Sequence, residues 1–293
     1  MPIFSNSAWA NQRWKPDQHE EASWLSEMEP AKRIDIRQIV ADRLVELRTR
    51  RLPRALTPEH LRYVHKSLFS GLHWEAGNYR GTPIGDTSAS VPAISGAKLV
   101  LEIADQMNWV FEGLRAQNYL HRLPKEEFVV QEANLMHGII NERPFYYGNY
   151  LVTKFIAGHV AENAGYKFDP LSVAEARFDE AIKKAVRNDL TPLRGIVRDL
   201  SRPEGAIIFK DAMKTGNWSA IYDRPRFQPA YEIVLEAIGG YNARGRIADG
   251  DLSPREQAVI NKVQTELDAG RLNETPSGRY RAWFFDQARS PDR

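Results

Sequence analysis

The feature that most constrains this chain is the recurrence of apolar residues every three to four positions. Leu61, Val64 and Leu68 form the first such stripe, and Thr57 and Pro58 before it are typical of a helix start. The same spacing recurs in residues 99–114, 129–140, 151–160, 178–185, 193–200 and 259–267. A helical period repeated along most of the chain predicts an all-α fold.

Local signals place individual helices within this bundle. The stripe at 151–160 is apolar on most sides and is followed by Gly165, so we expect a central helix that ends there. The segments Ser172–Glu175 and Ser253–Glu256 have the spacing of a capping box, in which the first and fourth residues bond to each other's backbone amides. We expect each segment to begin a helix.

Shifts in composition divide the chain into three parts. Residues 81–95 are rich in Gly, Pro, Ser and Thr, which predicts a loop or a short hairpin. Proline interrupts the helical pattern around 201–205, where we place a boundary. The expected organisation is a partly helical N-terminal extension at 1–56, a core at 57–203 and a small helical C-terminal appendage at 204–293.

Composition also excludes several classes of function. The 42% hydrophobic and 27% charged fractions suit an ordinary globular protein, and no run of about 18 apolar residues exists to span a membrane. The absence of cysteine excludes disulfides, thiol nucleophiles and thiolate zinc sites. A net charge of +2 does not indicate a nucleic-acid partner. Because the N-terminal residues lack the apolar run of a signal peptide, we expect a cytoplasmic protein, or one exported by a specialised secretion system without a cleaved signal peptide.

Three collinear segments resemble the Fic family of nucleotide transferases. They are His65–Arg80, Gln131–Asp169 and Phe178–Leu193, and with their flanks they cover residues 57–200. The resemblance implies an all-α, Fic-like helical bundle with a short β-hairpin flap after the first segment, at Gly81–Ser95. In the family this flap receives an extended target segment by strand addition. A target or regulatory protein is therefore the partner that the resemblance implies.

The second segment contains the position of the family's signature loop. That loop reads His-Pro-Phe, two residues of which the second is acidic, and then Gly-Asn-Gly-Arg, with a further Arg three positions on. The aligned residues here are Arg143, Pro144, Phe145, Tyr146, Tyr147, Gly148, Asn149, Tyr150, Leu151 and Lys154. The family's histidine, acid, second glycine and first arginine are therefore replaced in this chain.

These replacements remove two chemical functions that the resemblance leads us to expect. The family's histidine takes the proton from a target hydroxyl, whereas Arg143 in its slot stays protonated and has no lone pair to accept one. Tyr147 stands in the acidic slot, and a neutral phenol is a poor Mg²⁺ ligand. Glu142 and His137 are close in sequence, but on a helix they point to other sides. The resemblance thus implies no intact catalytic residue, no metal ligand and no tight binding of Mg²⁺.

The remaining residues of the loop suit a phosphate group. Gly148 and Asn149 would present backbone amides at the start of a helix, where Lys154 adds positive charge. Pro144 and Phe145 would support the loop. The resemblance therefore implies ATP or another nucleotide as the ligand. The alternative is that this segment forms only a tight turn between two helices.

Two functions remain open at this point. One is a catalytically impaired Fic-fold protein that acts as a binding or regulatory module in a bacterial toxin, mobile-element or effector context. The other is an active nucleotidyl- or phosphate-group transferase that modifies a target protein hydroxyl through a non-standard site. Ser23 and Glu27 have the spacing of the family's inhibitory helix, but Met28 stands where Gly or Asn is expected, so chance explains the pair.

Overall fold

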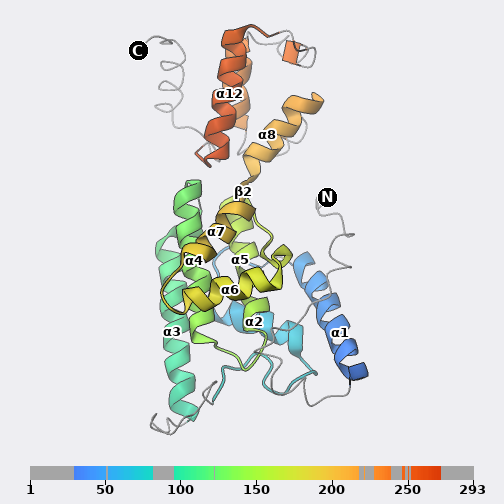
Figure 1. Ribbon diagram of the computed structural model, residues 1–293, viewed down its shortest axis with the longest axis vertical. Coiled ribbons are helices and arrows are strands. Elements are labelled where there is room, and N and C mark those ends of the chain that lie inside the picture. The colour runs from blue at the N-terminus through green and yellow to red at the C-terminus, as the bar shows by residue number, and fades with distance from the viewer. Residues whose placement is uncertain are drawn as a thin grey trace. The chain divides into compact units, whose positions relative to one another are not determined.

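The chain folds into helices that are joined by turns (Figure 1). The structure, a computed structural model, describes residues 30–50, 52–81, 96–121, 123–217, 221, 228–238, 246–247, 250 and 252–271. Within these ranges each strand has only 2 residues, whereas the helices have 10 or more outside two short 3-10 turns. The expected all-α class is confirmed.

The elements follow one another in a simple order. The helices are α1 (Pro30–Thr49), α2 (Pro58–Phe69), α3 (Gly96–Ala116), α4 (Lys125–Glu142), α5 (Asn149–Ala164), α6 (Glu175–Ala185), α7 (Thr191–Leu200), α8 (Glu204–Thr215), α10 (Gln228–Ile238) and α12 (Pro254–Asp268). The 3-10 turns are η1 (Asn118–Leu120) and η2 (Pro170–Ser172), and the strands are β1 (Tyr166–Lys167) and β2 (Arg202–Pro203). Each apolar stripe seen in the sequence lies on one of these helices.

Two of the expected helix ends form as the sequence indicates. α5 stops before Gly165, whose φ of 91° is a conformation that only glycine adopts without steric cost. At the start of α12, the Ser253 Oγ accepts a hydrogen bond from the Glu256 N–H at 3.3 Å. The Glu256 carboxylate in turn accepts from the Ser253 N–H at 2.8 Å, which completes the expected capping box.

The capping box expected at Ser172–Glu175 is wrong. Ser172 closes the turn η2, and its Oγ donates to the carbonyl oxygen of Asp169 at 2.7 Å. The residue that precedes α6 is Ala174, which has no side-chain oxygen to cap a helix. Pro170 fixes the backbone at the first position of η2, and this turn occupies the residues that the pattern assigned to the helix start.

The residues group into two compact units. The first contains residues up to 119 together with 132–160 and 169–196, and the second contains 120–131, 161–168 and 197–293. The expected boundaries at 56 and 203 stay predictions, because α4, α5 and α7 each contribute residues to both units.

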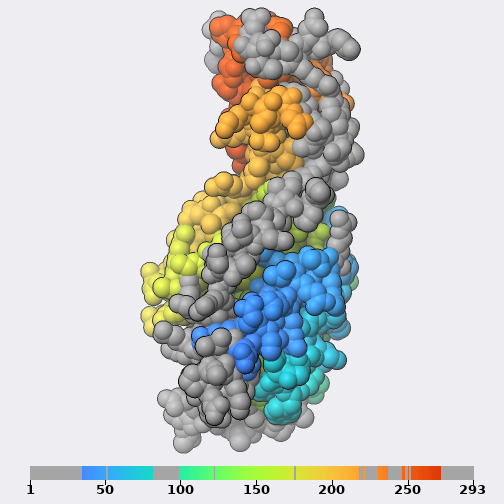
Figure 2. All heavy atoms as spheres, turned by 90° about the vertical axis from the view of Figure 1, so that its right-hand side faces the viewer, coloured from blue at the N-terminus to red at the C-terminus, as the bar shows by residue number. Residues whose placement is uncertain are grey.

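The core of the first unit is built on α2 and α5. Leu61 and Val64 of α2, with Val152 and Ile156 of α5, are all fully buried. This burial is consistent with the central position expected for the apolar helix. α1 packs along α2, as the blue and cyan surfaces of Figure 2 show, and the Arg43 guanidinium on α1 donates to two carbonyl oxygens at the C-terminal end of α2. These bonds satisfy carbonyls that a helix end leaves unpaired.

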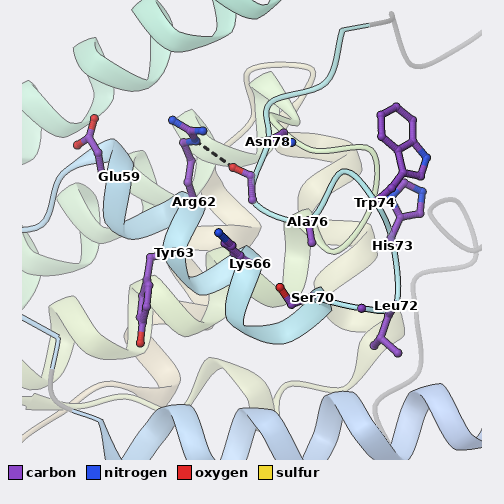
Figure 3. A pocket seen from close by; sticks show the side chains of 12 residues that line it. Glu59, Arg62, Tyr63, Lys66, Ser70, Leu72, His73, Trp74, Ala76 and Asn78 are labelled. Atoms are coloured by element: carbon purple, nitrogen blue, oxygen red, sulfur yellow. Dashed lines mark hydrogen bonds between the residues drawn. The ribbon is translucent and has the colours of Figure 1, made fainter.

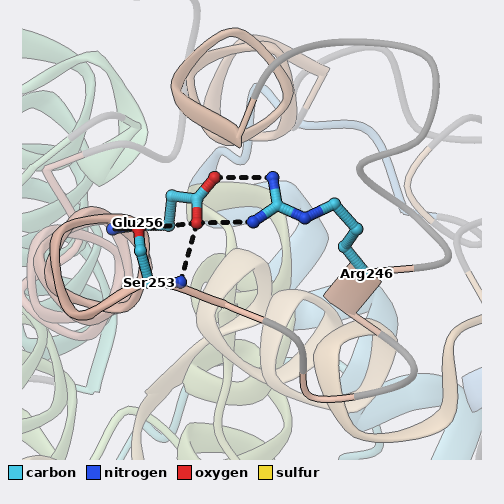
Figure 4. A network of polar contacts seen from close by, with 3 residues as sticks. All are labelled: Arg246, Ser253 and Glu256. Carbon is cyan, nitrogen blue, oxygen red and sulfur yellow. Dashed lines mark hydrogen bonds and ion pairs between the residues drawn. The ribbon is translucent and has the colours of Figure 1, made fainter.

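The second unit has a separate small core. α8, α10 and α12 contribute buried residues to it, among them Phe209, Tyr231 and Val263. Antiparallel pairing of β1 with β2 sets Tyr166 opposite Pro203. An ion pair holds the chain before α12, because both terminal nitrogens of Arg246 donate to the Glu256 carboxylate at 2.8 Å (Figure 4).

Some expected features fall outside the described residues. They are the flap beyond Gly81, up to Ser95, and the Ser23–Glu27 pair. Within the described part of the chain, no helix is both long enough and apolar enough to cross a membrane.

Candidate functional site

The candidate site is the turn of residues 143–148, which joins α4 to α5. Both of its ends have positive φ angles, 42° at Arg143 and 70° at Gly148. Arginine rarely adopts positive φ, whereas histidine and asparagine tolerate it better. A histidine, which the family has at this position, would therefore adopt the backbone conformation of Arg143 with less strain.

Asn149 closes this turn with two reciprocal hydrogen bonds. Its Oδ1 accepts from the Phe145 N–H, and its Nδ2 donates to the Phe145 carbonyl oxygen, both at 2.9 Å. The side chain is only 1% exposed, so water does not compete for these bonds. Asn149 therefore fixes the turn from inside, and its amide group is not aimed at a ligand.

Gly148 lies directly against α2. A Cβ atom at this position would be 2.5 Å from the ring of Phe69, and the φ of 70° adds strain for any other residue. Glycine is therefore required here for close packing as well as for its backbone freedom.

His65 on α2 ties the turn to the segment after α2. Its Nδ1 accepts a hydrogen bond from the Gly77 N–H at 2.8 Å, so the ring proton is on Nε2, which donates to the Tyr147 carbonyl oxygen at 3.2 Å. The ring also stacks on Phe145 with 3.9 Å between centroids. Burial lowers the pKa of His65 to about 3, which keeps the ring neutral.

Arg80 holds the other end of the turn. Its Nε donates to the Arg143 carbonyl oxygen at 2.7 Å and its Nη2 to the Glu142 carbonyl oxygen at 3.1 Å. Its backbone N–H donates to the Pro144 carbonyl oxygen at 2.9 Å. Arg80 thus satisfies the carbonyls at the end of α4 and fixes the entry to the turn.

Tyr147 directs its ring into an aromatic cluster. The ring centroid lies 5.1 Å from that of His65, 4.9 Å from that of Phe69 and 4.5 Å from that of His73. Tyr147 is 3% exposed, and burial raises the pKa of its phenol. The side chain in the acidic slot is therefore a neutral core residue.

Lys154 and Tyr150 both contact Phe178 on α6. The Lys154 Nζ lies 4.1 Å from the centroid of the Phe178 ring, a cation–π contact, and the Tyr150 ring meets it edge-on at 5.7 Å. Leu151 is buried. The structure thus brings Pro144, Phe145, Gly148 and Asn149 together in the turn, whereas the Lys154 ammonium is seated on a neighbouring helix.

The candidate substitutes for the missing base, Glu142 and His137, both lie on α4 before the turn. Glu142 Oε1 accepts a hydrogen bond from Asn141 Nδ2 at 3.2 Å, and burial lowers the pKa of His137 on α4. Among the described residues there is no group of three or more His, Asp or Glu side chains that could hold a metal ion.

No family model matches the chain. A protein adenylyltransferase of Bartonella henselae is 26% identical over 200 residues, which are 63% of this chain and 36% of the relative. The chain thus spans little more than a third of that relative's length.

Solved structures of Fic domains are also similar to this chain. The Fic domain of the VirB-translocated effector Bep5 from Bartonella clarridgeiae is 25% identical, with 61% of this chain and 86% of that chain covered and a TM-score of 0.51. BepC of Bartonella tribocorum, solved with bound AMPPNP, is 20% identical, with 60% and 89% covered and a TM-score of 0.53. The chain has a Fic fold.

Within the Fic fold, the sequence located the turn but missed two residues that hold it. His65 and Arg80 contact the turn from the segment that precedes the expected flap. A signal for His65 was present, because it is a polar residue beside Val64 on the buried side of α2. Its bonds to the Tyr147 carbonyl oxygen and the Gly77 N–H depend on the folded chain, which brings these groups beside it.

Proposed function

We propose that this chain is a Fic-fold binding module that holds the phosphates of ATP or another nucleotide at the start of α5 and transfers the nucleotidyl group poorly. The observation that carries the proposal is the contrast between Tyr147 in the turn and Asn149 at the start of α5. Asn149 keeps the turn closed through Phe145, whereas Tyr147 fills the acidic slot with a buried ring.

The residues present fit an anionic group. Backbone N–H groups at the first turn of a helix point toward its N-terminal end, where the helix dipole favours negative charge, and α5 begins at this turn. Within the described residues, no hydrogen bond or ion pair engages the Arg143 guanidinium, so its charge is available to a phosphate. The Fic structures solved with AMPPNP and with ADP support a nucleotide as the ligand.

The same residues do not fit efficient transfer. Arg143 cannot remove a proton from a hydroxyl, and losing a general base lowers a rate by about 10²- to 10⁴-fold. Tyr147 offers no carboxylate to Mg²⁺, and its ring is held by His65, Phe69 and His73. We therefore assign this chain to binding or regulation of a target protein, which would reach the site beside Gly81.

The setting of this function is a bacterial effector, toxin or mobile element. The Bep relatives are VirB-translocated effectors, which supports export by a specialised secretion system without a cleaved signal peptide. A cytoplasmic role in the producing cell is the other location compatible with the proposal.

A labelling experiment tests the loss of transfer. The full chain is incubated with α-labelled ATP, Mg²⁺ and a lysate, beside an intact Fic adenylyltransferase as the positive control. We expect labelling weaker by about 10²-fold or more, as loss of the base requires. Robust Mg²⁺-dependent labelling of a discrete protein would instead establish an active transferase with a non-standard site.

A further inference from the structure

The outer face of α2 forms one side of a pocket that is separate from the candidate turn. The pocket has a volume of about 830 Å³, and the segment 70–78 forms its other side (Figure 3). A volume of this size is in the range of ligand sites in proteins, which is about 300 to 1,000 Å³.

Two cations, Arg62 and Lys66, lie along the pocket, and the Arg62 charge also acts on the nearby Glu59 carboxylate. Arg62 and Lys66 are four residues apart on α2, so they share one face with their Cα atoms ~6 Å apart along the axis. Neither forms an ion pair with a carboxylate in the described part of the chain, and Glu59 is the sole acid that lines the described pocket. Like charges at this spacing repel, so a ligand that brings carboxylates would relieve that repulsion.

The Arg62 guanidinium and the Lys66 stem both contact the segment that follows α2. The Arg62 Nε donates to the Gly77 carbonyl oxygen at 2.9 Å, and its guanidinium lies 5.4 Å from the centroid of the Tyr79 ring. The Lys66 stem packs so closely on Gly77 that a Cβ there would be 2.8 Å from the Lys66 Cβ. Less side-chain entropy is therefore lost when the Arg62 guanidinium meets a partner.

Aromatic rings lie at the two ends of the pocket. Figure 3 places Tyr63 at one end and Trp74, beside His73, at the other, with Lys66 between them. Trp74 is 82% exposed and Tyr63 is 40% exposed. Exposed tryptophan and tyrosine beside arginine are the residues that most often carry the binding energy of protein interfaces.

From this arrangement we propose that the pocket docks an acidic peptide segment of a partner protein, with carboxylates on Arg62 and Lys66 and an apolar side chain on Trp74. An extended peptide can place its acids beside the two cations and neutral residues beside Glu59. A nucleic-acid strand carries a phosphate at every nucleotide and would bring one against Glu59. Charge complementarity therefore favours the peptide, and the inference does not depend on nucleotide binding at the turn.

The experiment is a selection from a random peptide library displayed on phage, performed with the full chain. Wild type, Lys66→Glu and Trp74→Ser are compared with Lys210→Glu, which makes the same charge change at an exposed position of α8. We expect enriched peptides that pair Asp or Glu with an aromatic residue and that lose binding to Lys66→Glu and Trp74→Ser only.

Fluorescence polarisation then measures the most enriched peptide. The Kd should rise about fivefold or more in Lys66→Glu, and by a similar factor when the peptide's acids are changed to amides or the salt concentration is raised. The proposal is overturned if no enriched peptide depends on Lys66 and Trp74, or if peptides with amides in place of acids bind equally well. It is also overturned if poly(U) displaces the labelled peptide at a lower concentration than the unlabelled peptide does. Circular dichroism of each variant confirms that it is folded.

Discussion

The Nε2 of His65 lies 3.2 Å from the carbonyl oxygen of Tyr147, a residue 82 positions further along the chain. Through this bond α2 holds the backbone of the candidate turn, and through Nδ1 the same ring holds Gly77 in the wall of the acidic-peptide pocket. The two sites thus share a single buried side chain. A change at His65 should therefore disturb both.

His65→Leu should destabilise the protein. Leucine keeps most of the volume but leaves the Gly77 N–H and the Tyr147 carbonyl oxygen buried without their partner, and each such loss costs about 1 to 3 kcal/mol. We expect the free energy of unfolding in urea to fall by about 2 to 5 kcal/mol. The control is His159→Leu, at an exposed hydrogen bond, which should change it by about 0.5 kcal/mol or less. Equal effects of the two substitutions would show that His65 does not hold the turn.

Gly148→Ala should be far more damaging than an ordinary glycine replacement. The new Cβ meets the Phe69 ring at 2.5 Å and the φ of 70° strains the backbone, so we expect a loss of about 2 kcal/mol or more. Gly195→Ala on α7 is the matched control, because outside its own helical turn nothing lies within 4 Å of its Cβ position. There the better helix propensity of alanine should raise stability by about 0.5 to 1 kcal/mol. The same sign of change at both positions in urea unfolding would refute the packing of Gly148 on Phe69.

Glu132→Gln should stabilise the protein increasingly as the pH rises. Glu132 is fully buried on α4 and neither carboxylate oxygen has a hydrogen-bond partner within the described residues, so burial raises its pKa well above the ordinary value. Because the pKa of Glu132 is higher in the folded chain than in the unfolded chain, the stability that the neutral acid provides is complete below the pKa of the unfolded chain. It is lost as the pH rises toward the folded pKa.

The gain from Glu132→Gln should therefore grow by up to about 1.4 kcal/mol per pH unit over that window. Urea unfolding of wild type and variant near pH 5 and near pH 8 measures the difference. A gain that stays constant with pH would mean that Glu132 is ionised in the folded chain.

Glu256→Gln tests the second unit separately. The Arg246 guanidinium, together with Ser253, lowers the pKa of the Glu256 carboxyl to about 2. A lowered folded pKa gives stability that is present above the ordinary pKa and is lost as the pH falls toward 2. We expect calorimetry to show a lower Tm for the variant near neutral pH, with the difference shrinking in acid. A Tm difference that is as large near pH 3 would point to a role for Glu256 other than its charge.

The sequence was informative where the signal is local. The helical period of apolar residues predicted α2 to α7. Gly165 marked the end of α5, and Ser253 marked the start of α12. Ser172 misled because Pro170 starts a 3-10 turn that competes with the helix for the same residues. The signature loop was located by its matches, yet the direction of the Tyr147 ring depends on His65, Phe69 and His73, which only the folded chain brings together.

Isothermal titration of the full chain with ATP, with and without Mg²⁺, tests the proposed binding most directly. Because Tyr147 provides no carboxylate for the metal, we expect measurable binding whose Kd changes less than about threefold on adding Mg²⁺. Arg143→Ala should weaken this binding by about fivefold or more, whereas Arg187→Ala, at an exposed position after α6, should leave it unchanged. No detectable heat at millimolar ATP, with the chain shown to be folded, would contradict the proposal and leave residues 143–148 as a structural turn.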